Sequence, residues 1–255
     1  IPFARYVAMN RGTLHFPFKR YQMQPVWRAE RPQKGRYREF TQCDADVVGS
    51  NSLWNEVELV HLYRNTFDTL GLKDAEITLN NRKLLAALAL KCGAASMLTS
   101  ITIAIDKLDK IGIDKVMESL KESGLTSEQV QTIHTYLSIS GSNREKINQI
   151  SNLLQGIHEA EKGIEELEFI LNRVPDHYVH LDFKLARGLD YYTGTIYEVK
   201  APQTVKMGSI GGGGRYDNLT GLFGVEGISG VGISFGVDRI YDVMDTLNLF
   251  PNDLN

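Results

Sequence analysis

Cysteine is scarce in this chain, and long apolar runs are absent from it. Cys43 and Cys92 are the two cysteines among 255 residues, and neither has a second Cys or a His nearby at metal-ligand spacing. This argues against a disulfide framework and a structural zinc site, and it predicts a reducing, cytoplasmic setting. No apolar window is long enough to span a bilayer, so we do not expect a membrane protein.

The sequence also lacks the common nucleotide-binding and catalytic motifs. Residues 211–214 are four consecutive glycines, but no Gly-Lys-Ser/Thr follows them, and the G-x-G-x-x-G spacing of a dinucleotide site is missing. Such a run permits close approach of the backbone to a ligand or a neighbouring strand, and a glycine-rich bulge explains it as well. The six histidines are scattered, without a metal cluster or a Ser-His-Asp order, so none is assigned to catalysis.

Neither end of the sequence has the marks of a natural terminus. The first residues, 1–6, contain no initiator Met and no basic-then-apolar secretion signal, and the last ones stop abruptly after a helix-like segment. We therefore expect the chain to be part of a longer protein.

Positive charge is concentrated in one window of an acidic chain. The formal net charge is −3, which argues against capture of nucleic acid by charge alone. Residues 19–38 nevertheless contain seven cations and a single anion, Glu30. The cations are Lys19, Arg20, Arg28, Arg31, Lys34, Arg36 and Arg38. The window predicts an anionic ligand.

Periodicity predicts an α+β fold with a mostly antiparallel sheet flanked by helices. Two β-favouring stretches, 21–30 and 37–48, enclose a Pro/Gly turn and predict an antiparallel hairpin with a basic loop. A helix is predicted over 50–70, with Ser50 or Ser52 as its N-cap. Further strands are predicted at 77–79, 179–185, 191–199, 208–213 and 227–235, and further helices at 82–91 and 237–247.

The middle of the chain differs from both ends. Residues 94–173 contain no Pro, are rich in Lys, Glu, Ile and Leu, and predict four or five short amphipathic helices with loops at 123–124 and 140–143. We therefore predict three parts, in which residues 1–93 and 174–255 form a core and residues 94–173 form a helical insertion.

The basic hairpin carries the first candidate site. Arg28 and Glu30 are predicted on one strand face, where the guanidinium can bind a phosphate and the carboxylate can accept from an amine. If only these two residues are considered, a solvated ion pair worth about 0–1 kcal/mol explains them better than a ligand site does. In the loop, Arg36 and Arg38 alternate with Tyr37, a pattern suited to stacking on a base while neutralising phosphate. A charged, soluble hairpin tip explains the loop equally well.

Two later segments are candidates as well. At 187–194 an Arg and an Asp lie between glycines before an apolar strand, and Tyr191 and Tyr192 complete a polar cluster typical of a ligand-lining edge. A simple turn explains the glycines but not this cluster. Arg239 lies in the first turn of a predicted helix, where a cation is disfavoured by about 0.3–1 kcal/mol. An anionic ligand would account for it, although Asp238 partly compensates.

In this order, these segments resemble the class II aminoacyl-tRNA synthetases and, more narrowly, the histidyl-tRNA synthetase family. Residues 27–40 (WRAERPQKGRYREF) are similar to that family's motif 2, with Trp27 in the place of Phe. Residues 187–198 resemble the histidyl-specific Arg-Gly-Leu-Asp-Tyr-Tyr-Thr-Gly-x-x-x-Glu segment, and residues 230–239 resemble motif 3. The resemblance covers essentially the whole chain, and it implies the class II fold.

The resemblance implies a site for ATP and a site for histidine. The residues implied for ATP are Arg28 at the α-phosphate, Glu30 with Tyr37 or Phe40 at the adenine, and Arg36 and Arg239 at the distal phosphates. The residues implied for histidine are Gln42, Asp46, Arg187, Tyr191, Tyr192, Gly212 and Gly213, with residues 211–215 as the floor beneath the substrate. The catalytic residues implied are Arg187 and Arg28. Magnesium is implied with ATP, and no side chain is assigned to bind a metal.

The implied activity is ATP-dependent activation of histidine to histidyl-adenylate and its transfer to tRNA(His) by a cytoplasmic enzyme. The full-length protein is expected to be a homodimer, and motif 1 and an anticodon-binding domain are expected outside the 255 residues. The alternative is a non-catalytic, histidine-sensing regulatory subunit of ATP phosphoribosyltransferase, which shares the fold. The arginines at positions 28, 36, 187 and 239 weigh against it, and the modest net charge weighs against a domain that binds only RNA.

Overall fold

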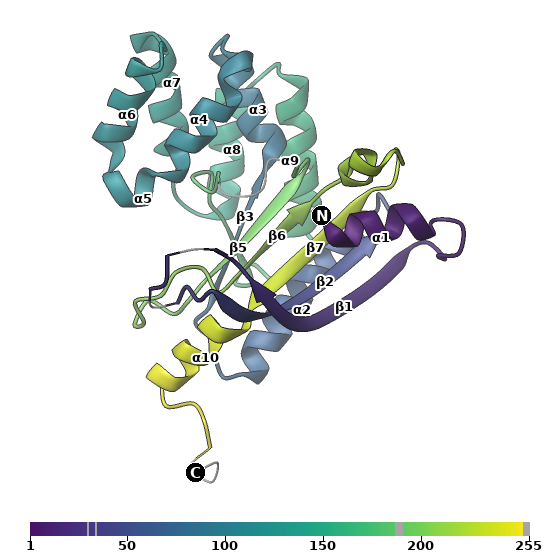
Figure 1. The fold of residues 1–255 in the computed structure, drawn as a ribbon. Coiled ribbons are helices and arrows are strands. Elements are labelled where there is room, and N and C mark those ends of the chain that lie inside the picture. Colours follow the sequence, from purple (N-terminus) through teal and green to yellow (C-terminus); the bar gives the residue numbers. More distant parts are fainter. Residues whose placement is uncertain (30, 34, 187–190, 252–255) are drawn as a thin grey trace. The chain divides into compact units, whose positions relative to one another are not determined.

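The computed structural model describes residues 1–29, 31–33, 35–186 and 191–251. The chain divides into two compact units, one formed by Ile1–Thr78 with Tyr197–Asn255 and the other by Leu79–Ile196. The strands found in the described residues form a seven-stranded sheet in the order β1-β2-β7-β6-β5-β3-β4. Figure 1 labels these elements.

The first unit contains the hairpin and the strands that follow the second unit in sequence. Its helices are α1 (Pro2–Asn10), α2 (Trp54–Thr69), the 3-10 helix η2 (Leu219–Phe223) and α10 (Val237–Thr246). Its strands are β1 (Phe18–Trp27), β2 (Glu39–Val48), β6 (Gly211–Arg215) and β7 (Gly230–Gly236), while β3 (Glu76–Asn81) and β5 (Thr195–Lys200) each run across the boundary between the units. The pairings β1–β2, β2–β7 and β6–β7 are all antiparallel, as predicted.

The β1–β2 hairpin has a continuous register from Phe18 opposite Val48 to Trp27 opposite Glu39. Because residues directly opposite one another in an antiparallel pair point to the same face, alternate positions divide the hairpin into two faces. One face carries Ala45 and Val47. The other face is polar and is described below.

Helix α2 covers the apolar face of these strands, behind β2 and β7 in Figure 1. Tyr63 and Phe67 are fully buried and contact Phe235 of β7, with ring centroids 4.9 and 5.8 Å away. Such aromatic pairs contribute about 0.5–1.5 kcal/mol each beyond the area that they bury. The Tyr63 hydroxyl also donates to the carbonyl oxygens of Gly212 and Ser234, each 3.0 Å away. Helix α2 therefore holds the backbones of β6 and β7 from behind.

A buried ion pair joins the same helix to β6. Arg215 Nη2 donates to Glu56 Oε2 at 2.7 Å, and the two side chains are 4% and 0% exposed. Arg215 Nη1 donates to Asp217 Oδ1 at 3.1 Å. Burial alone would lower the pKa of Arg215, but the bonds to Glu56 and the charges of Glu56 and Asp217 raise it. The guanidinium therefore stays charged inside the unit.

The second unit is mostly helical. Its helices are α3 (Arg82–Lys91), η1 (Ala95–Met97), α4 (Leu98–Asp106), α5 (Leu108–Ile111), α6 (Ile113–Glu122), α7 (Ser127–Leu137), α8 (Asn143–Leu153) and α9 (His158–Leu171), and its own short strand is β4 (Val179–Leu181). Thr126 and Ser142 form capping boxes with Gln129 and Glu145 at the starts of α7 and α8. Gly163 of α9 packs against Leu84 of α3.

The predicted elements agree with the structure in type and differ from it at their ends. The described part of 94–173 holds six α-helices and one 3-10 helix rather than four or five helices, because Gly112, at φ +81°, separates α5 from α6. The N-cap of α2 is Leu53, so the prediction of Ser50 or Ser52 is wrong. The strand predicted over 191–199 begins only at Thr195. The three-part division at residues 93 and 173 stays a prediction.

Candidate functional site

The polar face of the first unit's sheet is built from alternate residues of β2. Gln42, Asp44 and Asp46 lie on this face, opposite Gln24, Gln22 and Arg20 of β1 on one side and Gly236, Ser234 and Gly232 of β7 on the other. Gln42 Nε2 donates to Ser234 Oγ at 2.9 Å. Asp44 Oδ1 lies 3.3 Å from the same Gln42 nitrogen. The result is a row of polar side chains beside strand positions that carry little or no side chain.

Glycine residues of β7 make room for the side chain of Asp46 in this row. A Cβ at Gly232 would overlap the Asp46 carboxylate, and a Cβ at Gly230 would overlap the ring of Tyr216. A Cβ at Gly213 of β6 would overlap the Gly232 carbonyl oxygen, so β6 and β7 approach closely there. At Gly212, by contrast, a Cβ would meet nothing nearer than 3.4 Å. The glycine runs therefore allow both close strand packing and open space over the sheet.

Replacing Gly232 with Ala should destabilise the first unit by about 1–3 kcal/mol, the usual cost of overfilling a packed position. The added methyl group can fit only if Asp46 moves away from β7. Urea unfolding of the variant measures this loss. The control is Gly221→Ala, because a Cβ at Gly221 meets no atom within 4 Å. Equal stability of the two variants would contradict the placement of Asp46 over Gly232.

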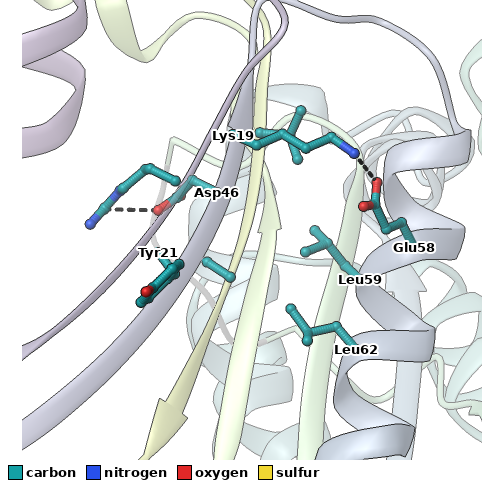
Figure 2. A pocket seen from close by; sticks show the side chains of 9 residues that line it. Lys19, Tyr21, Asp46, Glu58, Leu59 and Leu62 are labelled. Carbon is teal, nitrogen blue, oxygen red and sulfur yellow. Dashed lines mark hydrogen bonds and ion pairs between the residues drawn. The ribbon is translucent and has the colours of Figure 1, made fainter.

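Asp46 is the most enclosed acid of this face. Its Oδ1 accepts from the Tyr216 hydroxyl at 2.6 Å, and its Oδ2 pairs with Arg20 Nη2 at 2.8 Å. Burial raises the pKa of Asp46, and the hydrogen bond from Tyr216 and the charge of Arg20 act in the opposite direction. Figure 2 shows Asp46 on one side of the hairpin and the Lys19–Glu58 pair on the other.

The hollow drawn in Figure 2 lies mainly on the other side of the hairpin. Lys19 and Tyr21 of β1 face Glu58, Leu59 and Leu62 of α2 there. It is separate from the polar row that contains Gln42, although Asp46 borders it.

The basic loop of the hairpin begins where β1 ends. β1 stops at Trp27, so Arg28 lies just beyond the strand rather than inside it, which corrects the prediction of a strand through residue 30. The Arg28 guanidinium lies over the ring of Phe40, 4.9 Å from its centroid. Gln33 and Arg36 close the tip through two backbone hydrogen bonds of 3.1 and 2.8 Å. An aromatic ring and a cation therefore lie together at the base of the loop.

Helix α10 holds this loop through side chains of its first two turns. Arg239 Nε donates to the Gly35 carbonyl oxygen and Arg239 Nη1 to the Ser209 carbonyl oxygen, both at 2.6 Å. The Tyr37 hydroxyl donates to Asp242 Oδ2 at 2.7 Å, which raises the pKa of Tyr37. Backbone carbonyl oxygens thus partner the cation at this helix start, where the sequence suggested an anionic ligand.

The structure places the predicted residues in several groups. Gln42, Asp46, Gly212 and Gly213 belong to neighbouring strands of the sheet, and Arg28, Arg36, Tyr37, Phe40 and Arg239 lie at the hairpin loop or the start of α10. Tyr191 and Tyr192 belong to the second unit, where their ring centroids are 5.1 Å apart. Glu30 and Arg187 lie outside the described residues. The roles assigned to all of these residues stay predictions.

Arg215 does not belong to the substrate floor, contrary to the prediction for residues 211–215. It is opposite Val231 in the register, and its guanidinium is bound to Glu56 of α2. It therefore supports β6 from behind.

Sequence reasoning missed the partners of Asp46. Arg20 stands out in the sequence only as one cation of the basic window, and Tyr216 is not among the predicted site residues. The opposite charges of Arg20 and Asp46 could have served as a signal only if the first strand had been extended to include residue 20. No local pattern indicated Tyr216, because it lies 170 residues from Asp46.

The described residues contain no group of three or more His, Cys, Asp or Glu side chains placed to hold a metal ion. None of the helices in that part of the chain is long and apolar enough to cross a membrane.

An antiparallel sheet with a polar face and a basic motif 2 hairpin held by the motif 3 helix defines the catalytic fold of class II aminoacyl-tRNA synthetases. The family model described as histidyl-tRNA synthetase matches residues 3–240. The chain belongs to the histidyl-tRNA synthetase family.

Known relatives agree with this assignment. A histidine–tRNA ligase of Flavobacterium johnsoniae is 56% identical over 98% of this chain and 54% of its own length, and that of Porphyromonas gingivalis is 56% identical over 98% of this chain and 56% of its own. The chain thus spans about half the length of the curated relatives it matches. The crystal structure of histidyl-tRNA synthetase from Nostoc sp. PCC 7120 superposes with a TM-score of 0.88 at 35% identity, covering 98% of this chain and 59% of that one.

A further solved structure shares this fold. A protein from Bacillus halodurans, described as an ATP phosphoribosyltransferase regulatory subunit/histidyl-tRNA synthetase, superposes with a TM-score of 0.82 over 95% of this chain and 62% of that one. Its sequence identity is 20%, so this likeness concerns the fold alone.

Proposed function

We propose that this chain is the catalytic region of an enzyme that activates histidine with ATP and transfers it to tRNA(His). The observation that carries the proposal is the polar sheet face: Gln42 and Asp46 lie over glycine-rich strands, and the basic loop begins at the other end of the same hairpin. The arrangement offers hydrogen-bond acceptors for an amino acid and cations for a nucleotide. Family membership supports the same activity.

In the first reaction a carboxylate oxygen of histidine attacks the α-phosphorus of ATP. A new oxygen–phosphorus bond forms, the bond to the bridging oxygen of the β-phosphate breaks, and pyrophosphate leaves with the electron pair. Negative charge grows on the non-bridging oxygens, so positioned cations are the main help that a protein can give. The proposal gives this role to Arg28, which lies at the base of the loop, and the resemblance implies the same role for Arg187.

Recognition of the amino acid is assigned to the polar row. Asp46, when ionised, can accept the N–H of an imidazole ring, and Gln42 can both donate and accept. Tyr191 and Tyr192 are assigned to histidine by resemblance. A site built around such hydrogen bonds rejects apolar amino acids, because they would leave its buried polar groups unpaired.

Magnesium would reach the protein with ATP. Mg²⁺ commonly keeps several waters and binds through substrate phosphates, so the nucleotide can supply most of its ligands. When bound it would neutralise charge on the leaving phosphates. A cytoplasmic homodimer as the full-length form belongs to the same proposal.

Exchange of labelled pyrophosphate into ATP, measured with each standard amino acid in turn, tests this function. It is measured on this chain and on a chimera in which the chain replaces the matching segment of the Flavobacterium johnsoniae relative. We expect exchange with histidine and with no other amino acid, in the chimera at least. Histidine binding without exchange in either protein would favour the regulatory subunit. Absence of both, with an active F. johnsoniae enzyme as control, would refute the proposal.

A further inference from the structure

Arg20 and Asp46 form a shielded ion pair across the hairpin. They are directly opposite in the β1–β2 register, and Arg20 Nη2 lies 2.8 Å from Asp46 Oδ2. Their side chains are 15% and 12% exposed, whereas those of the neighbouring Lys19–Glu58 pair are 52% and 54% exposed. A pair shielded to this degree is less screened by solvent than an ordinary surface pair.

The Arg20 guanidinium is itself fixed on several sides. The ring of Phe3, from α1, lies against it with its centroid 4.1 Å from the guanidinium carbon. Its Nη1 donates to Gln22 Oε1. Its Nε is buried and makes no hydrogen bond to any described residue. A planar group held between an aromatic ring and a strand presents one defined edge to Asp46, which a lysine could not do.

Asp46 is held from its other side by Tyr216. The tyrosine hydroxyl donates to Oδ1, while Arg20 donates to Oδ2, so each carboxylate oxygen has one partner. A carboxylate oxygen has two acceptor positions, and one on each oxygen therefore remains for a ligand. The two partners come from opposite sides of β2, Arg20 from β1 and Tyr216 from the residue that follows β6, and together they fix the plane of the carboxylate.

Burial is the largest influence on Asp46 and raises its pKa, while its two partners favour the ionised form and limit that rise. Burial and the neighbouring charge of Asp44 raise the pKa of Asp46, while Tyr216 and Arg20 lower it. Loss of the Arg20 cation would leave burial and Asp44 less opposed.

We propose that Arg20 is a positioning residue for histidine recognition, which holds the Asp46 carboxylate in the orientation in which it accepts the imidazole N–H of the substrate. The proposal rests on the proposed function, since it assigns Asp46 to the substrate. In this role Arg20 contacts neither histidine nor ATP. It acts through Asp46.

The test compares Arg20→Met, Arg20→Lys and the matched control Lys19→Met in histidine-dependent pyrophosphate exchange between about pH 5 and 8. Because an ionised hydrogen-bond partner contributes about 1.5–3 kcal/mol, we expect the KM for histidine to rise about tenfold or more in Arg20→Met. The value of kcat should change little. The acid limb of kcat/KM should move to higher pH, since a less opposed carboxyl group binds its proton more readily. The substrate histidine also titrates in this pH range, but it does so identically for every variant, so its effect cancels when each variant is compared with wild type at the same pH.

Arg20→Lys should bring the acid limb of kcat/KM back to its wild-type pH, because lysine keeps the positive charge. It should reverse only part of the rise in the KM for histidine, because lysine lacks the planar guanidinium that orients the Asp46 carboxylate. Lys19→Met removes a cation from the same strand on the opposite face, and it should change neither quantity. An Arg20→Met variant that keeps the wild-type acid limb and KM would overturn the proposal. A variant that lost kcat alone would also overturn it.

A second measurement is independent of enzyme activity. NMR titration of the Asp46 carboxyl carbon, assigned with Asp46→Asn, should show a higher pKa in Arg20→Met than in wild type and no change in Lys19→Met. An unchanged Asp46 pKa in Arg20→Met would refute the positioning role even if the protein activated no amino acid. A shifted pKa without histidine-dependent exchange would refute the proposed function and leave the Arg20–Asp46 coupling established.

Discussion

Replacing Arg215 with Met will destabilise the first unit by about 3–5 kcal/mol, the usual loss when one member of a buried ion pair is removed. The variant leaves the Glu56 carboxylate, which is 0% exposed, without the guanidinium that binds it. The buried Glu56 carboxyl group must then bind a proton or become more exposed, and exposure requires the α2–β6 contact to loosen. Urea unfolding followed by far-UV circular dichroism measures the loss.

The double variant Arg215→Met with Glu56→Leu separates charge from packing. Exchange of a buried ion pair for apolar side chains of similar volume is often neutral or stabilising, so the double variant should recover most of the stability lost by Arg215→Met. Lys19→Met is the control for a surface pair and should cost no more than about 1 kcal/mol. A loss in Arg215→Met as small as in Lys19→Met would contradict a structural role for the buried pair.

Replacing Arg28 with Ala will lower kcat for histidine-dependent pyrophosphate exchange by about 10²–10³-fold, the usual effect of removing one group that stabilises transition-state charge. If Arg28 binds the α-phosphate mainly as its charge grows, kcat and kcat/KM should fall together. Arg28 lies over Phe40 at an exposed position, so the substitution should leave the fold intact.

Two further variants sharpen this test. Arg28→Lys keeps the charge but not the two-pronged geometry and should recover only part of the rate. Arg11→Ala removes an exposed cation just after α1 and should leave the rate unchanged. A rise in the KM for ATP with an unchanged kcat would instead assign Arg28 to ground-state binding.

The hairpin shows which features of the fold local sequence patterns can predict. Its alternating residues and Pro/Gly turn predicted an antiparallel pair with a basic loop, and β1 and β2 form that pair. The end of β1 was missed by three residues, because the β1–β2 ladder ends at Trp27 opposite Glu39, although a backbone hydrogen bond of 2.8 Å from Arg28 N to the Arg38 carbonyl oxygen follows it. Helix α3 was predicted over residues 82–91 and is found there. Its N-cap, Asn81, accepts from Lys83 N, a purely local contact.

The start of α2 shows where local reasoning fails. Ser50 and Ser52 are good N-cap residues by type, but Leu53 is the N-cap. Ser50 Oγ instead accepts from Ser52 N and from Asn55 Nδ2, within the turn before the helix. The final helix gives a similar case, since the aromatic Tyr241 is 57% exposed, while Val243 is buried. In both cases contacts outside the helix, rather than its own sequence pattern, decided which residue caps it or which side chain is buried.

The sequence by itself determined the fold class, most of the elements and the residue types of the site, because periodicity, turn residues and motif spacing act over short stretches of chain. Only the tertiary structure decided which side chains meet. Asp46 and Tyr216 are 170 residues apart, and Glu56 and Arg215 are 159 apart. Their contacts depend on the β2–β7–β6 strand order, on the register of each pair and on the face that each residue occupies. A shift of one residue in any register would turn Asp46 or Arg215 to the opposite face, and no local pattern fixes that register across so long a separation.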